Sequence, residues 1–136
     1  MIKVLLADDH AFVRDSLVEL FTASGDVTVV AECEDGEQVL DAARRTQPDV
    51  VLLDLAMPRV TGLQAARQLL SAHPDARIVV LTGSMTPSLV REAQEIGVVG
   101  YLLKGDDPGA LPDHVRAVAA GGTAWSDAAA TASTSA

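Results

Sequence analysis

Four side chains that can take part in metal or phosphoryl chemistry follow apolar runs of the sequence. Asp8 and Asp9 follow the first run, Asp54 follows the third, and Lys104 follows the fifth. If these runs are parallel strands of one sheet, their carboxyl ends lie at one edge and the four side chains meet there. Three neighbouring carboxylates repel one another unless a cation joins them. The pattern therefore predicts a site for a divalent metal ion and a phosphoryl group.

Further residues near this edge have two interpretations each. Thr82 ends the fourth run, where its hydroxyl can donate a hydrogen bond to a phosphoryl oxygen, but β-branched residues are also common at strand ends. Tyr101 lies in the fifth run and is either a packing residue or a ring that moves when the site is filled. Asp9 could instead cap the following helix, and Lys104 could be a solvated surface lysine.

Other reactive residue types do not form a recognisable motif. His10, His73 and His114 are far apart and lack metal-ligand spacing, so we expect ordinary roles for all three. Cys33 is the single cysteine, which excludes an internal disulfide and predicts a small buried residue at a strand end. The sequence contains neither a GxxxxGK[ST] phosphate loop nor a GxGxxG fingerprint.

The elements that position these residues alternate along the chain. Five apolar runs rich in Val, Ile and Leu predict strands that are covered on both faces, as in a parallel sheet, at residues 2–7, 27–31, 50–53, 78–81 and 98–103. Five segments of helical period lie between and after them, at residues 12–23, 37–45, 61–72, 88–96 and 111–120. This alternation predicts an α/β fold with right-handed crossovers, although patterning alone gives no strand order.

Composition restricts the functional classes. The chain has 136 residues, 49% of them hydrophobic, which is enough for one domain with a core. Its net charge of −9 and ten scattered basic residues do not favour nucleic-acid binding by this chain itself. No apolar stretch approaches the roughly 20 residues of a membrane span, and no signal peptide precedes the first strand-like run, so we expect a cytoplasmic protein without membrane contact.

The residues from 2 to about 122 resemble the receiver domain of two-component response regulators. The resemblance rests on Asp8-Asp9, on Asp54 through Gly62 with Met57-Pro58, on Thr82, and on Tyr101-Leu102-Leu103-Lys104. The stretches 7–14, 100–104 and 117–122 are most similar to the branch with a C-terminal LuxR-type helix-turn-helix domain (NarL/FixJ-like). The resemblance implies a flavodoxin-like (CheY-like), doubly wound sheet of five parallel strands, in the order 2-1-3-4-5, with five helices.

The resemblance also implies roles for individual residues. Asp54 would be the phosphoacceptor, and Asp9, Asp54 and the backbone carbonyl of Ala56 would ligate Mg²⁺ directly. Asp8 would act on the metal through water, and Lys104 and Thr82 would contact the phosphoryl group. Thr82 and Tyr101 would be the switch residues, with Thr82 turning toward the phosphoryl group and Tyr101 filling the space it leaves. Gly105 follows Lys104 where many members have proline, so a trans peptide bond is expected there.

The resemblance places a receiver domain at residues 1–122, followed by a linker stub or flexible tail at 123–136, with the DNA-binding domain absent from this chain. The implied function is a phosphorylation-dependent signalling switch that accepts a phosphoryl group from a sensor histidine kinase and controls transcription. DNA would be bound only through the missing domain, and phosphorylation could produce a homodimer. Such a protein is not a turnover enzyme, because it catalyses only its own phosphorylation and dephosphorylation.

Two rival functions remain open. One is a stand-alone or phosphorylation-independent receiver-like interaction module, whose usual sign is the loss of an acid, the threonine or the lysine; none is lost here. The other is a Mg²⁺-dependent phosphohydrolase of the haloacid dehalogenase type. That class usually carries a DxD motif after the first strand and a cap domain, whereas this chain has adjacent acids there and no room for a cap.

Overall fold

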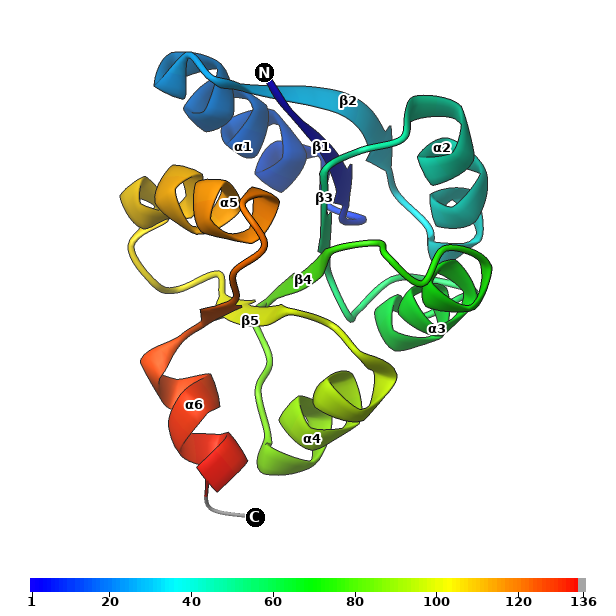
Figure 1. Cartoon of the computed structure of the whole chain (residues 1–136), viewed down its shortest axis with the longest axis vertical. Coiled ribbons are helices and arrows are strands. Elements are labelled where there is room, and N and C mark those ends of the chain that lie inside the picture. The colour runs from blue at the N-terminus through cyan, green and yellow to red at the C-terminus, as the bar shows by residue number, and fades with distance from the viewer. Residues whose placement is uncertain (135–136) are drawn as a thin grey trace.

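The computed structural model describes residues 1–134, with side chains through residue 130. It is a parallel sheet with helices on both faces (Figure 1). The strands are β1 (Ile2–Ala7), β2 (Val27–Cys33), β3 (Val50–Leu53), β4 (Ile78–Thr82), β5 (Gly100–Leu103) and β6 (Ala124–Trp125). The helices are α1 (Ala11–Ser24), α2 (Val39–Thr46), α3 (Gly62–Ala72), α4 (Pro87–Ile96), α5 (Leu111–Ala119) and α6 (Asp127–Thr134), and short 3-10 turns η1 (Gly36–Gln38) and η2 (Pro108–Ala110) precede α2 and α5.

The strand order is β2-β1-β3-β4-β5-β6, and every neighbouring pair is parallel. The predicted doubly wound fold, with five strands in the order 2-1-3-4-5, is confirmed, and β6 extends the sheet beyond β5. The order reverses between β1 and β3, so the crevice at the carboxyl ends of these two strands is where a ligand site is expected in such folds. Asp8, Asp9 and Asp54 lie directly after these strands.

The helices divide into two layers, with α1 and α5 on one face of the sheet and α2, α3 and α4 on the other (Figure 1). Successive strand residues point to opposite layers, so Val4 and Leu6 pack toward α1 and α5 while Leu5 and Ala7 pack toward the other helices. Every residue of β3 and β4 is buried. Burial on both faces explains why these strands read as unbroken apolar runs.

Capping residues set the ends of α3 and α4. Thr61 begins α3 with a capping box, in which its hydroxyl accepts from the Gln64 N–H and the Gln64 side chain accepts from the Thr61 N–H. Thr86 caps α4, and Pro87 occupies the first turn of that helix. Gly97 ends α4 in the left-handed conformation, with φ of 108°.

The segment after residue 122 differs from the predicted linker or tail. It forms β6, which pairs with β5, and α6, which packs beside α4. Gly100 makes this possible, because a Cβ there would lie 2.4 Å from the Ala124 carbonyl oxygen. The Ser126 hydroxyl caps α6 by accepting from the Ala129 N–H, and Ala129 is fully buried. The sheet therefore has six strands instead of five. The boundary at 122 remains a prediction, and residues 135–136 of the predicted tail lie outside the described residues.

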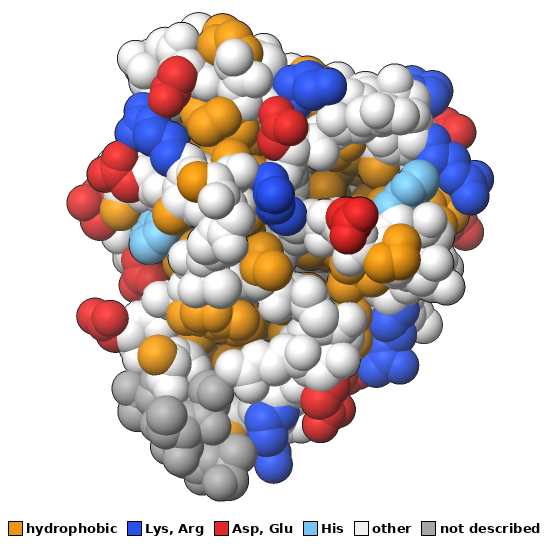
Figure 2. All heavy atoms as spheres, in the orientation of Figure 1, with side chains coloured by type: hydrophobic (Ala, Val, Ile, Leu, Met, Phe, Trp, Pro, Cys, Tyr) orange, Lys and Arg blue, Asp and Glu red, His pale blue; other side chains and the backbone are white. Residues whose placement is uncertain are grey.

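Three further features concern the surface charge, the length of the helices and the peptide bond after Lys104. Acidic and basic side chains are interspersed on the face shown in Figure 2, without a continuous basic stripe. Within residues 1–134, none of the helices is both long and apolar enough to cross a bilayer. The same residues contain no cis peptide bond, which confirms the trans bond predicted between Lys104 and Gly105.

Candidate functional site

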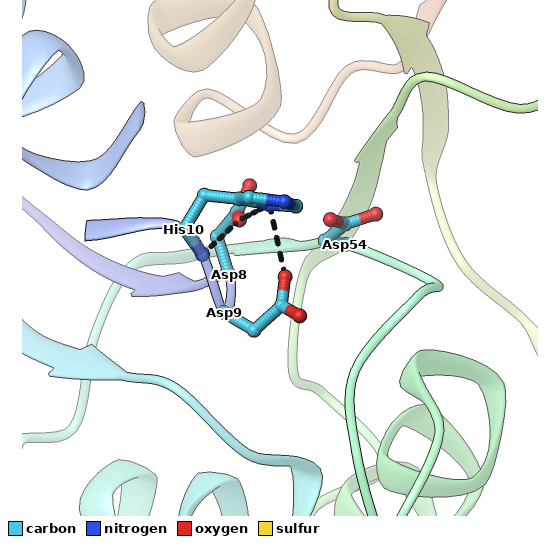
Figure 3. A group of neighbouring side chains, drawn as sticks. All are labelled: Asp8, Asp9, His10 and Asp54. Carbon is cyan, nitrogen blue, oxygen red and sulfur yellow. Dashed lines mark hydrogen bonds and ion pairs between the residues drawn. The ribbon is translucent and has the colours of Figure 1, made fainter. Parts of the chain in front are cut away.

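The side chains predicted to meet at the carboxyl edge of the sheet do meet there. The Lys104 ammonium lies 2.5 Å from Asp8 Oδ2 and 2.9 Å from Asp54 Oδ2. Asp8, Asp9 and Asp54, together with His10, each offer a ligand atom within 4.8 Å of the others (Figure 3). The predicted convergence of residues that lie almost a hundred positions apart is therefore confirmed, while the role of each residue remains a prediction.

Backbone hydrogen bonds between neighbouring strands hold these residues in place. The Asp8 N–H donates to the Cys33 carbonyl at 2.9 Å, and the Asp54 N–H donates to the Ala7 carbonyl at 2.8 Å. The sheet ladder thus continues one residue beyond β1 and β3, so the backbone of each acid is fixed. Gly62 lets α3 approach this point, because a Cβ on Gly62 would lie 2.1 Å from the Asp54 carbonyl oxygen.

Burial makes the charges at this edge interact strongly. The side chains of Asp8 and Asp54 are 6% and 3% exposed, and that of Lys104 is 23% exposed. Burial by itself lowers the pKa of Lys104, but its hydrogen bonds to Asp8 and Asp54 and the charges of these carboxylates outweigh this and raise the pKa. Lys104 is therefore a firmly charged partner of the two buried acids.

Asp9 is not the helix cap that it could have been. The N-cap of α1 is His10, and no side-chain hydrogen bond caps that terminus. Asp9 is instead 35% exposed, with Oδ1 2.9 Å from His10 Nδ1. Its carboxylate is thus directed to the mouth of the acidic cluster and not to the helix backbone (Figure 3).

The structure places His10 within the acidic cluster, while the expectation that it has an ordinary role stays a prediction. Its Nδ1 lies 3.1 Å from Asp8 Oδ1 as well as 2.9 Å from Asp9 Oδ1. Histidine spacing could not reveal this, because His10 combines with carboxylates and not with other histidines. The available signal was its position directly after two acids at a strand end. His73 and His114 are not part of the cluster.

Thr82 and Tyr101 both bind the backbone of Ser84, in the loop between β4 and α4. The Ser84 N–H donates to the Thr82 hydroxyl at 3.3 Å, and the Tyr101 hydroxyl donates to the Ser84 carbonyl at 2.7 Å. Thr82 is 1% exposed and Tyr101 is fully buried. Burial, followed by the negative charge of Asp54, raises the pKa of Tyr101 to about 12. The two predicted switch residues are therefore connected through one residue, a link that their sequence positions do not reveal.

The donor atoms of the cluster fit a hard divalent cation. Asp8, Asp9 and Asp54 supply carboxylate oxygens on one side of the crevice, and oxygen ligands are those that Mg²⁺ prefers. Ala56 lies in the exposed loop beside them, where its N–H donates to Asp54 Oδ1 at 3.3 Å. Metal ligation by the Ala56 carbonyl, and the action of Asp8 through water, remain predictions.

Comparisons with known proteins agree with this geometry. Residues 4–116 match the family described as the response regulator receiver domain. The uncharacterized transcriptional regulatory protein YxjL of Bacillus subtilis is 43% identical over 120 residues, which cover 88% of this chain and 55% of the relative. The response regulator GacA of Pseudomonas aeruginosa is 37% identical over 121 residues, which cover 89% of this chain and 56% of that protein. The chain thus spans about half the length of these curated relatives.

Solved structures show the same fold. A two-component response regulator of the LuxR family from Aurantimonas superposes with a TM-score of 0.92 at 32% identity, covering 98% of this chain and 95% of that one. The receiver domain of the response regulator NarL from Mycobacterium tuberculosis superposes with a TM-score of 0.83 at 32% identity, covering 88% and 97%. The predicted resemblance is confirmed, and the chain belongs to the response regulator receiver domain family.

Proposed function

We propose that this chain is a phosphorylation-dependent switch that accepts a phosphoryl group on Asp54 from a phosphohistidine of a sensor kinase. The observation that supports this best is the placement of the buried Asp54 carboxylate, which lies within 2.9 Å of the Lys104 ammonium and beside Asp8 and Asp9. A carboxylate at the tip of a buried strand is an oriented nucleophile.

The two oxygens of the Asp54 carboxylate have different partners, and this arrangement supports phosphoryl transfer to Asp54. One oxygen, Oδ2, accepts from Lys104, and the other, Oδ1, accepts from the Ala56 N–H at 3.3 Å. A carboxylate oxygen attacks phosphorus in line, so that an O–P bond forms while the P–N bond to the kinase histidine breaks and the imidazole leaves. Lys104 then stabilises the negative charge of the phosphoryl oxygens. The product is an acyl phosphate on Asp54.

Asp9 and Asp54 would hold Mg²⁺ together with the Ala56 carbonyl, and Asp8 would act through water. When bound, the ion neutralises charge on the carboxylates and on the phosphoryl oxygens. The oxygen donors of Asp8, Asp9 and Asp54 support this proposal because they lie within 4.8 Å of one another at the same edge.

The switch would operate through Ser84. The Thr82 hydroxyl now accepts a hydrogen bond from the Ser84 N–H at 3.3 Å, and a turn of the Thr82 side chain toward a phosphoryl oxygen would release that N–H. The loop that carries Ser84 can then shift, and the Tyr101 hydroxyl, bound to the Ser84 carbonyl, shifts with it. Tyr101 is already buried, so the proposed switch does not require its ring to move in from solvent. Its role is to couple the loop that carries Ser84 to β5.

We further propose that the full-length protein regulates transcription through a C-terminal DNA-binding domain. The names of the relatives support this, since YxjL is called a transcriptional regulatory protein. The relatives are also about twice as long as the matched region. The proposed setting is the cytoplasm, with a sensor histidine kinase as partner and a homodimer after phosphorylation.

Phosphorylation by a small phosphodonor tests this function. The chain is incubated with acetyl phosphate and Mg²⁺ and then measured by intact mass spectrometry. We expect the addition of one phosphoryl group in the wild type and in Asp75→Asn, which changes an exposed acid outside the site. We expect no addition in Asp54→Asn. If the wild type gains no mass under these conditions, the proposed function is rejected and the chain is better described as a phosphorylation-independent interaction module.

A further inference from the structure

The imidazole of His10 faces the same cluster as the three carboxylates. Its Nδ1 lies 2.9 Å from Asp9 Oδ1 and 3.1 Å from Asp8 Oδ1, and the residue offers a ring nitrogen within 4.8 Å of the ligand atoms of Asp8, Asp9 and Asp54. Figure 3 shows the ring lying over Asp8 and Asp9, on the side of the crevice open to Asp54. A nitrogen donor is thus available beside the oxygen donors of the proposed Mg²⁺ site.

Neither helix capping nor core packing explains this position of the ring. His10 is the N-cap residue of α1, but its side chain makes no capping hydrogen bond. The side chain is 64% exposed, so apolar burial does not hold it either. The ring contacts the carboxylates of Asp8 and Asp9. The simplest alternative is an exposed histidine that pairs with acids and has no affinity for a metal.

Lys104 and His10 contact different carboxylate oxygens of Asp8. Lys104 contacts Asp8 Oδ2, whereas His10 contacts Asp8 Oδ1. Asp9 Oδ1 faces His10 as well. An ion that enters on the His10 side can therefore bind Asp9 and Asp54 while Lys104 keeps its place beside Asp8 and Asp54.

The distances allow His10, Asp9 and Asp54 to bind one ion after small movements. Metal–ligand bonds of about 2.0–2.2 Å place two ligands on opposite sides of an ion about 4.2 Å apart. The ligand atoms here lie within 4.8 Å of one another, so shifts of about half an ångström are sufficient. The exposed His10 ring and the partly exposed Asp9 can move by this amount without disturbing the core.

We propose that His10 Nδ1 is a ligand of this site for first-row transition-metal ions, so that the site binds Mn²⁺, Co²⁺ or Zn²⁺ more tightly than Mg²⁺. Mg²⁺ prefers oxygen ligands, whereas imidazole is a good ligand for zinc and other transition metals. The inference rests on the metal site of the proposed function but not on phosphoryl transfer, because it concerns the choice of ion alone.

Binding of the metal alone, to the metal-free chain, tests the proposal. Mn²⁺ affinity is measured from the free-ion signal in electron paramagnetic resonance, and Mg²⁺ affinity is measured by competition with Mn²⁺. We expect His10→Ala to weaken Mn²⁺ binding by about tenfold or more and to change Mg²⁺ binding by less than about twofold. His73→Ala removes an exposed histidine outside the cluster and should change neither affinity.

Pulsed electron paramagnetic resonance gives a direct readout of the ligand. Bound Mn²⁺ should show coupling to an imidazole nitrogen in the wild type and in His73→Ala, but not in His10→Ala. Absence of this coupling in the wild type overturns the proposal, as does an equal change in Mn²⁺ and Mg²⁺ affinity in His10→Ala. Labelling with acetyl phosphate at saturating Mg²⁺ is measured in parallel. Failure of this labelling rejects the proposed function, whereas the nitrogen coupling tests the metal ligand independently.

Discussion

Replacement of Lys104 by methionine tests how strongly the buried acids depend on a cation. The Lys104 ammonium lies 2.5 Å from Asp8 Oδ2 and 2.9 Å from Asp54 Oδ2, and both acids are less than a tenth exposed. Methionine keeps an apolar stem of similar length while removing the charge. The variant therefore leaves two neighbouring buried carboxylates without their shared positive partner.

The expected loss in the free energy of unfolding is about 2–3 kcal/mol near neutral pH in the absence of Mg²⁺. Removing one partner of a fully buried ion pair costs about 3–5 kcal/mol. The loss expected for Lys104→Met lies at or below the lower end of that range, because the Lys104 side chain is 23% exposed and water partly screens the site. With a denaturant slope of about 1–3 kcal/mol per molar in urea, the unfolding midpoint should fall by roughly 0.7–3 M.

Mg²⁺ should reduce the difference in stability between the wild type and Lys104→Met. In the wild type, Lys104 competes with a metal ion for the charge of Asp8 and Asp54, so Lys104→Met should bind Mg²⁺ more tightly. Binding at 100 times the dissociation constant stabilises the folded state by about 2.7 kcal/mol. Saturating Mg²⁺ should therefore recover much of the stability that the variant loses, while the wild type gains less at the same concentration.

The contribution of Lys104 to the free energy of unfolding depends on pH in one direction. The pKa of Lys104 is raised in the folded state, so its stabilising contribution is fully present below the ordinary lysine pKa of about 10.4. That contribution is lost as the pH rises through the higher folded pKa. The difference between wild type and Lys104→Met should thus be constant around neutrality and should decrease in strongly alkaline solution.

The assay is urea unfolding followed by circular dichroism, with and without Mg²⁺. Lys3→Met is the matched control, since it removes the same charge from a lysine whose ammonium contacts the Thr46 carbonyl at 3.4 Å and not the acids. If Lys104→Met is as stable as Lys3→Met without Mg²⁺, and its Mg²⁺ affinity is unchanged, Asp8 and Asp54 do not require a cation.

Three further predictions concern other buried groups. Because burial raises the pKa of Tyr101 to about 12, its phenolate absorbance should titrate near that pH in the folded protein and near pH 10 in urea; a folded midpoint near 10 would contradict its burial. In Gly100→Ala, the new Cβ would lie 2.4 Å from the Ala124 carbonyl oxygen, so β6 should detach, stability should fall by about 1–3 kcal/mol, and chymotrypsin should cut faster after Trp125 than in the wild type. Burial raises the pKa of Cys33 to about 11, so iodoacetamide should modify it slowly when folded and rapidly in urea at about pH 8; equal rates would show that the thiol is accessible.

Much of the site could be predicted because the signals that encode it are local. Unbroken apolar runs identified the buried strands, and Asp8, Asp54 and Lys104 stood directly after three of them. The geometry of parallel sheets then requires such residues to meet at one edge. The order of the strands came from the family resemblance and not from periodicity, because a run of Val and Leu does not specify which strand lies beside it.

Apolar runs and the polar residues after them thus predicted the first five strands and helices, the position of each reactive residue at the end of its strand, and the family of the chain. The tertiary structure decided the docking of β6 and α6, which lack an apolar period and depend on the space beside Gly100. It also decided that His10 turns toward Asp8 and Asp9, and that Thr82 and Tyr101 meet at Ser84. The physical reason is the same in each case: a periodic pattern reports which face of an element is buried, whereas a contact between two side chains depends on distances across the whole fold.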